Sequence, residues 1–382
     1  MNKINPQVKR MKPFIVMDIL EKAQEMRREG LDIIHLEVGE PDFDTPGCVT
    51  KAAIKAFEDG HTHYSHSLGD IELRRAICGL YNKEYGVKID PEQVVITSGS
   101  SPAILMVLML LGKPDNEFIY SNPGYACYQN FIWACNARAV PVPLHPENGF
   151  RYDIDEVKKY ITSATAGIMI NSPMNPVGNV IDADTLKELA RLDIPVISDE
   201  IYHGLVYEGK AHSILEFTDN AFVLNGFSKR FAMTGLRLGY LIAPKKYMRA
   251  LQTLQQNLFI CAPSITQKAG LAALQQSEKE VETMRQTYNE RRLYMVERLK
   301  KMGLDIPAKP TGAFYVFCDV RKFTGDSYRF AFDILENARV GVTPGIDFGS
   351  EGEGFIRLSY ANSIENIKEG LNRLENYLKK LQ

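Results

Sequence analysis

Lys229 and Arg237 are the residues of this chain best suited to covalent chemistry on a phosphorylated group. Residues 226–239 have the sequence GFSKRFAMTGLRLG, which places Lys229 just after an apolar run that predicts a buried strand. A desolvated lysine near other positive charges loses its proton at moderate pH and becomes a nucleophile. The guanidinium of Arg237 fits a phosphate clamp and would also discourage protonation of Lys229. Considered alone, the segment could equally be a loop with two exposed basic residues.

Two further charged residues lie in apolar surroundings and therefore need partners. Asp199 ends the run at 194–198, so its carboxylate is expected at the tip of a buried strand, as a ligand of a cation or as a helix cap. Arg357 lies in the strand-like segment FIRLSYA. Its planar fork suits the α-carboxylate of a substrate, and an internal salt bridge is the alternative.

Ser100 and Ser101 follow a predicted strand and open a predicted helix. Ser101 is the expected N-cap and Pro102 the first helical residue. The exposed N–H groups and the helix dipole at such a site favour an anion. The segment predicts phosphate ligands, although a plain capped helix would look the same.

These segments resemble those of class I aminotransferases, the aspartate aminotransferase family, and the likeness runs from LEVGEPDFDTP (36–46) to RLSYA (357–361). The resemblance implies pyridoxal 5'-phosphate held by Lys229 as a Schiff base, with Arg237 on its phosphate. Gly226 stands where some relatives have a hydroxyl residue, so Ser228 is the expected substitute. The cofactor-binding residues implied are Tyr64, Ser100, Ser101, Tyr125, Asn175, Asp199, Tyr202, Ser228, Lys229 and Arg237.

The resemblance also implies individual roles at the cofactor ring. Asp199, in the motif DEIY, would keep the pyridine nitrogen protonated, so that the ring withdraws the electrons released from the substrate. Tyr202 and Asn175, the latter in NSPMNPVG, would contact the ring oxygen, and Tyr125 would pack on the ring. Without the resemblance, an ordinary turn and core packing explain the last two segments. The substrate would be bound by Gly39, Asn175 and Arg357.

Tyr64 lies in the segment HTHYSHSLGDIELR (61–74), which is similar to a family pattern whose tyrosine reaches the phosphate of the neighbouring subunit. The resemblance therefore implies a homodimer with shared active sites. The three histidines of this segment have no accompanying cysteines or carboxylate cluster, so a solvated loop is expected in place of a metal site.

The implied reaction is transfer of an amino group from an L-amino acid to a 2-oxoacid, by family analogy 2-oxoglutarate, with ping-pong kinetics. The same cofactor can also support a carbon–sulfur β-lyase, which is the alternative. Phe14, Ile15, Val16, Met17 and Phe259 are candidates for the side-chain pocket. They favour apolar or aromatic amino acids over aspartate.

The elements that would position these residues are short buried strands alternating with helices, the pattern of an α/β fold with a mostly parallel sheet. Polar residues follow the apolar runs at 94–96, 118–120, 168–170, 195–197 and 222–224. Ligands of such sheets bind beyond the carboxyl ends of the strands. A seven-stranded cofactor-binding domain (46–284) and a smaller α+β domain (1–45 plus 285–382) are expected.

The composition is that of a folded protein acting on small molecules. The 382 residues are 45% hydrophobic and 24% charged, with a net charge of −2, which gives no broad attraction for nucleic acid or anionic lipid. No apolar stretch approaches the length of a membrane span. Six cysteines without CxxC spacing and no visible signal peptide predict a cytoplasmic protein.

Overall fold

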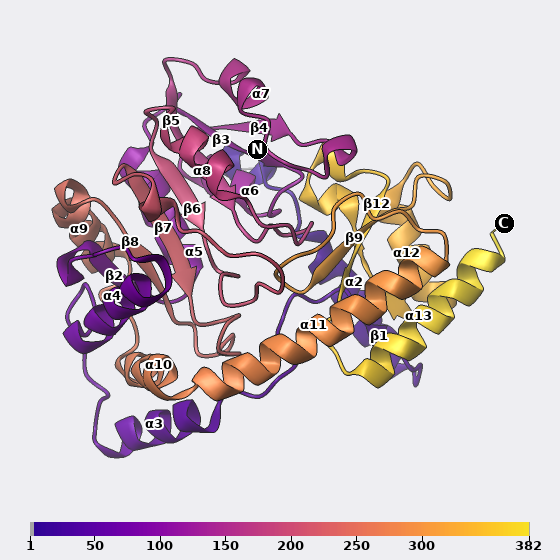
Figure 1. Cartoon of the computed structure of the whole chain (residues 1–382), viewed down its shortest axis with the longest axis horizontal. Helices are drawn as coiled ribbons and strands as arrows, with labels where there is room; N and C mark the ends of the chain where they lie inside the picture. Colours follow the sequence, from indigo (N-terminus) through magenta and orange to yellow (C-terminus); the bar gives the residue numbers. More distant parts are fainter. Residues whose placement is uncertain (1–3, 382) are drawn as a thin grey trace.

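A seven-stranded sheet lies at the centre of the computed structural model, which describes residues 4–381 (Figure 1). The strand order is β2-β8-β7-β6-β5-β3-β4. Strand β8 is antiparallel to β2 and β7, whereas the other pairs are parallel. The expected mostly parallel α/β sheet is confirmed. The strands are β2 (Val94–Thr97), β3 (Glu117–Asn122), β4 (Arg138–Pro143), β5 (Thr165–Asn171), β6 (Val196–Asp199), β7 (Ala221–Gly226) and β8 (Gly239–Ile242).

Both faces of the sheet are buried, which explains why its strands are apolar runs without polar alternation. In β5, Ile168 and Ile170 belong to the hydrophobic cluster on one face, while Met169 belongs to the cluster on the other. Four of the five apolar runs identified in the sequence lie within strands, and the fifth, 195–197, enters β6 at its second residue. Strands β4 and β8 were not predicted, because β4 contains two prolines and exposed residues, and β8 begins at Gly239, where the segment of Lys229 and Arg237 ends.

Helices cover the two faces of the sheet in separate layers, with α8 in front and α5 behind in Figure 1. One layer contains α4 (Ile71–Tyr85), α7 (Ile154–Lys159), α8 (Ala183–Ala190) and α10 (Ser264–Gln276), with α3 (Gly47–Glu58) packed on α10. The other layer contains α5 (Ser100–Leu111), α6 (Tyr128–Ala134) and α9 (Met248–Leu258). This arrangement directs the carboxyl ends of β5, β6 and β7 to one edge of the sheet.

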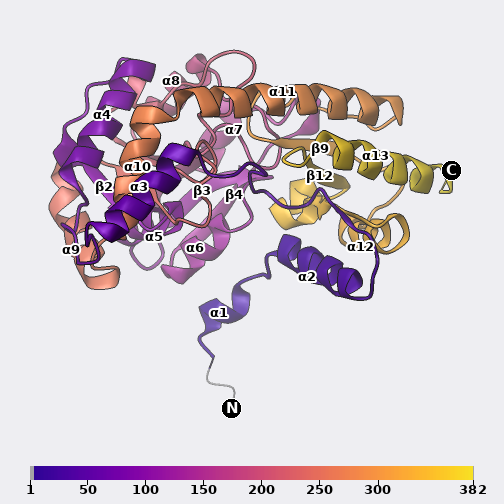
Figure 2. The ribbon, with the colours of Figure 1, turned by 90° about the horizontal axis from the view of Figure 1, so that it is seen from below.

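A second hydrophobic cluster joins the N-terminal helix α2 (Ile15–Arg28) to the C-terminal part of the chain. Figure 2 shows α2 beside α12, far from it in sequence. The antiparallel sheet β11-β12-β9 and the parallel pair β1-β10 lie in this cluster. Its other elements are α11 (Glu278–Lys301), α12 (Ser327–Ala338), α13 (Ile364–Lys379), β1 (Ile34–His35), β9 (Tyr315–Asp319), β10 (Val340–Gly341), β11 (Thr343–Pro344) and β12 (Phe355–Ser359).

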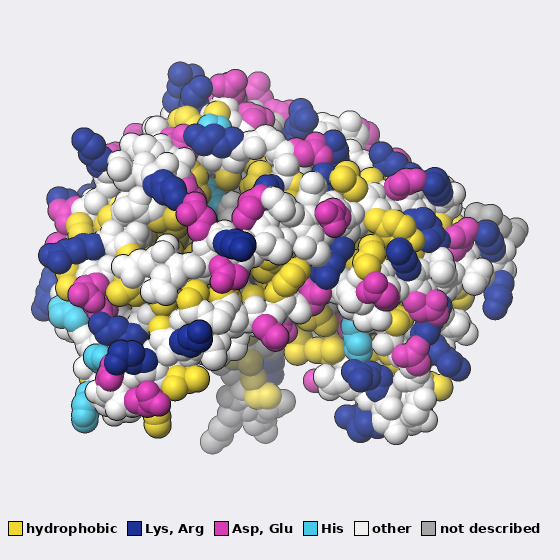
Figure 3. Space-filling model, turned by 60° about the horizontal axis from the view of Figure 1, so that its bottom comes forward, with side chains coloured by type: hydrophobic (Ala, Val, Ile, Leu, Met, Phe, Trp, Pro, Cys, Tyr) yellow, Lys and Arg dark blue, Asp and Glu magenta, His cyan; other side chains and the backbone are white. Residues whose placement is uncertain are grey.

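The surface carries both signs of charge in close alternation on the face shown in Figure 3. Ion pairs such as Lys83 with Glu278 and Arg285 with Glu282 contribute to this mixture. All six cysteines are free. Of the helices within residues 4–381, none combines the length and hydropathy needed to cross a membrane.

Candidate active site

A cavity of about 360 Å³ lies where the carboxyl ends of the central strands meet α2 and β12. It brings together residues that are far apart in the sequence. Tyr64 is the exception among the predicted site residues, because it lies outside the cavity and its side chain is 85% exposed. The predicted residues that line the cavity are Gly39, Ser100, Ser101, Tyr125, Asn175, Asp199, Tyr202, Ser228, Lys229, Arg237 and Arg357.

Lys229 follows β7 and extends its amino group into the cavity, where Nζ donates to the carbonyl of Gly39 at 2.6 Å. Burial lowers the pKa of Lys229 to about 8, and the positive charges of Arg357 and Arg237 act in the same direction. The carboxylates of Glu40 and Asp199 oppose this change. Lys229 can therefore exist as a neutral amine near physiological pH, as a nucleophile requires.

The N-terminus of α5 faces Arg237, an arrangement that suits an anion. Gly99 is the N-cap, with φ +91° and no side chain to bond the free N–H groups of the first turn. The Arg237 guanidinium lies so close that a Cβ at Gly99 would be 2.5 Å from its Nη2. Arg237 itself has a left-handed backbone, with φ +50°. The prediction that Ser101 is the N-cap was wrong, because the helix begins at Ser100 after the glycine.

Positions 226 and 228 are the two considered for a hydroxyl group that would contact the phosphate, and the structure distinguishes between them. Ser228 lines the cavity. At Gly226, a Cβ would lie 3.1 Å from the carbonyl of Leu238 and 3.2 Å from Gly239, within the sheet. A side chain at 226 would be crowded by its neighbours, so Ser228 remains the proposed phosphate ligand.

Asp199 ends β6 as a buried carboxylate whose hydrogen-bond donors are uncharged. Oδ2 accepts from Tyr128 Oη at 2.7 Å, and Oδ1 accepts from the N–H of Ile201 at 3.2 Å. Burial raises the pKa of Asp199 to about 6, and these two bonds limit the rise. A carboxylate in such a place is stabilised by a bound cation, and a protonated ring nitrogen would be one.

Arg357, on β12, bonds only neutral oxygens among the described residues. Nη1 donates to Asn175 Oδ1 at 2.8 Å, while Nη2 donates to the Glu37 carbonyl at 2.6 Å and to Thr343 Oγ1 at 3.1 Å. The buried Nε has no partner within residues 4–381. The alternative of an internal salt bridge finds no support, and a bound carboxylate would supply the missing charge.

These side chains fit pyridoxal phosphate as a group. The uncapped end of α5, together with Arg237 and Ser228, suits its phosphate, and the uncompensated carboxylate of Asp199 suits its ring nitrogen. Lys229 suits its aldehyde carbon. The roles of the individual residues remain predictions that rest on this placement.

Several residues that support the site were not predicted from the sequence. Tyr128 holds Asp199, and Tyr315 Oη lies 2.8 Å from Tyr202 Oη. A Cβ at Gly39 would be 2.2 Å from Tyr315 Oη, so a side chain at 39 would collide with this pair. An aromatic residue in a buried strand gives no sequence signal for such a role, since core packing is its usual purpose.

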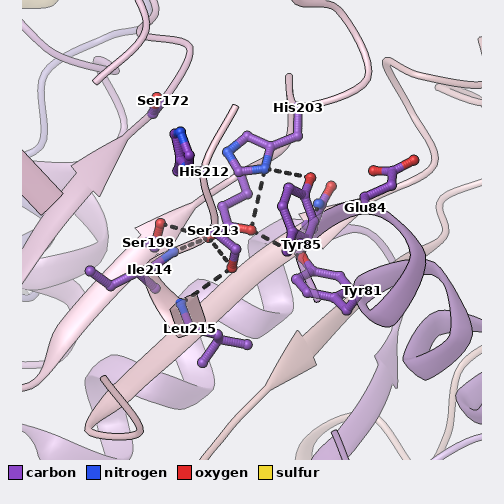
Figure 4. Close-up of polar contacts among 12 residues, drawn as sticks. Tyr81, Glu84, Tyr85, Ser172, Ser198, His203, His212, Ser213, Ile214 and Leu215 are labelled. Atoms are coloured by element: carbon purple, nitrogen blue, oxygen red, sulfur yellow. Dashed lines mark hydrogen bonds and ion pairs between the residues drawn. The ribbon is translucent and has the colours of Figure 1, made fainter. Parts of the chain in front are cut away.

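A buried polar cluster lies behind Asp199, centred on its neighbour Glu200. Figure 4 shows Tyr81, Ser198, Ser213 and the backbone of Ile214 converging on one point. The Glu200 carboxylate accepts hydrogen bonds from all four, at 2.9 to 3.1 Å. The cluster ties the end of β6 to α4 and to the turn after residue 212, which fixes the strand end that carries Asp199.

The wall of the cavity opposite the charged residues is apolar. Three of the side chains proposed for a specificity pocket line it, namely Phe14, Val16 and Met17. Ile15 and Phe259 do not, and Phe259 packs against the cluster of α5 and α9. The expectation for these two residues was wrong, because Phe259 is the C-cap of α9 and Ile15 begins α2 on the side that does not line the cavity.

Comparison with known proteins is consistent with this geometry. Residues 31–374 match the family model described as aminotransferase class I and II. The chain is 43% identical to the (5-formylfuran-3-yl)methyl phosphate transaminase of Methanocaldococcus jannaschii, covering 96% of this chain and 97% of that protein. It is 38% identical to aromatic-amino-acid aminotransferase 2 of Thermococcus litoralis, covering 91% and 92%.

The same similarity is found in three dimensions. The structure of aspartate aminotransferase from Thermus thermophilus with maleate superposes with a TM-score of 0.94 at 36% identity, covering 98% of this chain and all of that one. The similarity to these proteins, in sequence and in fold, therefore extends along nearly the full length of the chain. The chain belongs to the class I and II aminotransferase family.

Proposed function

We propose that this aminotransferase takes its amino group from an L-amino acid with an apolar or aromatic side chain. Transfer of an amino group to a 2-oxoacid, with pyridoxal phosphate as the cofactor, follows from membership of the family. The substrate does not, because the relatives are named for an aspartate, an aromatic amino acid and a phosphorylated furan aldehyde. A carbon–sulfur lyase is not favoured by these relatives.

The observation that carries the substrate proposal is the distribution of charge in the cavity. Its basic side chains, among the described residues, are Lys229, Arg237 and Arg357, and each already has a proposed role. Much of the remaining wall is formed by the apolar side chains Phe14, Val16, Met17, Leu20 and Ile104, beside polar groups such as Glu40 and Thr234. Apolar surface of this kind stabilises an apolar side chain by burial, at about 25 cal/mol per Å² removed from water. Within residues 4–381 of one subunit, no further basic side chain lines the cavity for a second carboxylate.

The residues of the chain then act in order on the bound amino acid. Arg357 and Asn175 orient it through its α-carboxylate, which places the α-hydrogen near Lys229. Neutral Lys229 takes that proton and returns it at a neighbouring carbon, acting as base and then as acid. When bound, pyridoxal phosphate supplies the electron sink that makes this proton acidic. Asp199, by its charge, would strengthen that effect.

The experiment is a single half-reaction on the protein loaded with cofactor. Phenylalanine, leucine, alanine and aspartate are added separately without any oxoacid, and the visible absorbance of the lysine-bound cofactor is followed. Phenylalanine and leucine are expected to react with higher kcat/KM than aspartate. A decisive preference for aspartate would contradict the proposal. Cystathionine is added in a separate sample without an acceptor, and release of pyruvate and ammonia over many turnovers there would establish a lyase.

A gain-of-charge variant sharpens this test. Met17→Arg places a cation on the apolar wall, so kcat/KM for aspartate relative to phenylalanine should rise by about tenfold or more. Lys229→Ala should abolish the half-reaction. Pyruvate and 2-oxoglutarate, compared as acceptors in the reverse half-reaction, identify the second substrate.

We further propose a cytoplasmic homodimer in which Tyr64 reaches the phosphate site of the partner. The support is exposure: Tyr64 points away from its own cavity, and large apolar side chains around it are also exposed, namely Ile54, Phe57, Leu258 and Ile260. The bond from Ser264 Oγ to the His61 carbonyl joins these segments into one surface. Exposed apolar surface of this kind is typical of a protein interface.

A further inference from the structure

The N-terminus of α2 is held by a carboxylate from the other end of the chain. Asp347 lies in the 3-10 helix Gly345–Phe348 and is 7% exposed. Its Oδ1 accepts from the N–H of Ile15 at 2.9 Å, and its Oδ2 accepts from the N–H of Val16 at 3.3 Å. The N-cap residue Phe14 provides no side-chain bond. Asp347 therefore satisfies two of the free N–H groups that a local cap would normally satisfy.

The helix that Asp347 holds is also the apolar wall of the cavity. Val16, Met17 and Leu20 lie on the first turns of α2 and line the cavity together with Phe14. The position of these side chains depends on where α2 begins. A displaced first turn would move the wall without moving Asp199, which ends β6, or Lys229, which follows β7.

Asp347 is at the same time close to the proposed carboxylate site. The next residue, Phe348, places its ring 4.9 Å from the guanidinium carbon of Arg357. One short segment thus contacts both Arg357 and α2. The segment therefore sets how far Arg357, which would bind the carboxylate of an amino acid, lies from the wall that would receive its side chain.

We infer that Asp347 is a positioning residue that determines specificity, by holding the α2 wall against the side chain of the amino donor. This inference rests on the proposed function, because it requires a donor whose side chain reaches the wall. Burial raises the pKa of Asp347 to about 6, so the carboxyl is still largely ionised at pH 7 and above, where it accepts both hydrogen bonds. The positive end of the α2 dipole favours that charge.

Two other contacts hold the same segment but cannot replace Asp347. Asn130 Nδ2 donates to the Lys12 carbonyl at 3.2 Å, and the Phe14 ring packs edge-on against Tyr125 with centroids 6.2 Å apart. Both lie before the first residue of α2. Without Asp347, the free N–H groups in the first turn of α2 would have to donate to water.

The test compares donors of different size in Asp347→Ala and Asp347→Asn, both loaded with cofactor. The half-reaction is measured with phenylalanine and with alanine, whose methyl group makes few contacts with the wall. In Asp347→Ala, kcat/KM for phenylalanine should fall roughly tenfold, mainly through KM, while kcat/KM for alanine stays within about twofold. Asp347→Asn keeps one acceptor and should give a smaller change in the same direction.

Asp18→Asn is the matched control, because it removes a carboxylate from the first turns of α2 that makes no bond to Ile15 or Val16. It should leave the phenylalanine-to-alanine ratio unchanged. Equal losses for both donors in both Asp347 variants, or no loss in either, would overturn the inference. Failure of the proposed function would be seen separately, as wild-type protein that does not prefer phenylalanine to aspartate.

Discussion

Lys229 lies between two arginines that favour its neutral form and two carboxylates that oppose it. Burial adds to the effect of the arginines, and the resulting pKa of about 8 is far below the ordinary lysine value of 10.5. In the cofactor-free protein, acylation of Lys229 should therefore rise with pH to a midpoint near 8. Peptide mass spectrometry after brief labelling measures the acylated fraction of Lys229 at each pH. A midpoint above pH 10 would contradict the lowered pKa of Lys229.

Arg237→Gln should raise that midpoint, because a positive charge that disfavours the ammonium form is removed. The same variant should weaken cofactor binding, since Arg237 faces the uncapped end of α5. Arg249→Gln, an exposed arginine on α9, is the control for loss of a positive charge. It should leave both measurements unchanged.

At Arg357, shape matters as well as charge. The guanidinium already uses its outer nitrogens on Asn175, Glu37 and Thr343, which fix its plane. Arg357→Lys keeps the charge but loses the bidentate fork, so KM for the amino donor should rise about 100-fold, equivalent to roughly 2–3 kcal/mol. Arg373→Lys, on α13 and outside the cavity, should have no such effect. An unchanged KM in Arg357→Lys would exclude the proposed carboxylate site.

Among the elements, the end of β6 is fixed by several buried polar contacts. Glu200 accepts bonds from α4, from β6 itself and from the turn at 213–214. Glu200→Ala would leave these buried donors without an acceptor and should lower the free energy of unfolding by about 3 kcal/mol. Glu200→Gln can donate to Tyr81 and accept from the others, so its loss should be below about 1 kcal/mol.

Glu200 should also make stability depend on pH. Burial raises the pKa of its carboxyl from 4.5 to about 8, so the protonated form is favoured by folding. Its contribution to stability is complete below pH 4.5 and is lost as the pH rises through 8. Denaturant unfolding between pH 5 and 9 should show this decline in the wild type and a smaller one in Glu200→Gln. If the stabilities of the wild type and of Glu200→Gln change with pH in parallel, the assignment of this decline to Glu200 is contradicted.

For the whole molecule, the shared active site gives a test of the proposed dimer. Lys229→Ala and Tyr64→Ala should each be nearly inactive alone. After they are mixed under conditions that exchange subunits, half of the dimers are mixed, and each contains one site with an intact Lys229 and an intact Tyr64 from the partner. Activity should recover to about a quarter of wild type. If native mass spectrometry shows that mixed dimers have formed and activity does not recover, the shared site is excluded.

The domain division at 46–284, with 1–45 and 285–382 as the smaller unit, remains a proposal. Helix α11 runs continuously through position 285, and α2 joins the C-terminal cluster as the division requires. The molecule thus places its cavity between the central sheet and elements from both ends of the chain.

Much of the fold could be predicted because the local signals were strong. Apolar runs predicted five of the seven central strands. Strands β4 and β8 are short or partly exposed, so their formation depends on pairing with neighbours. The start of α5 was misplaced because a glycine N-cap gives a weaker signal than the serines after it.

The sequence by itself determined which side chains are predicted to react, since Lys229, Asp199, Arg237 and Arg357 lie in segments whose residue types and spacing indicate their chemistry. Only the tertiary structure decided their partners: Tyr128 on Asp199, Gly99 beneath Arg237, and Asp347 on α2. These contacts join residues tens to hundreds of positions apart. No local pattern encodes such contacts, because they arise when the sheet and the two ends of the chain pack together.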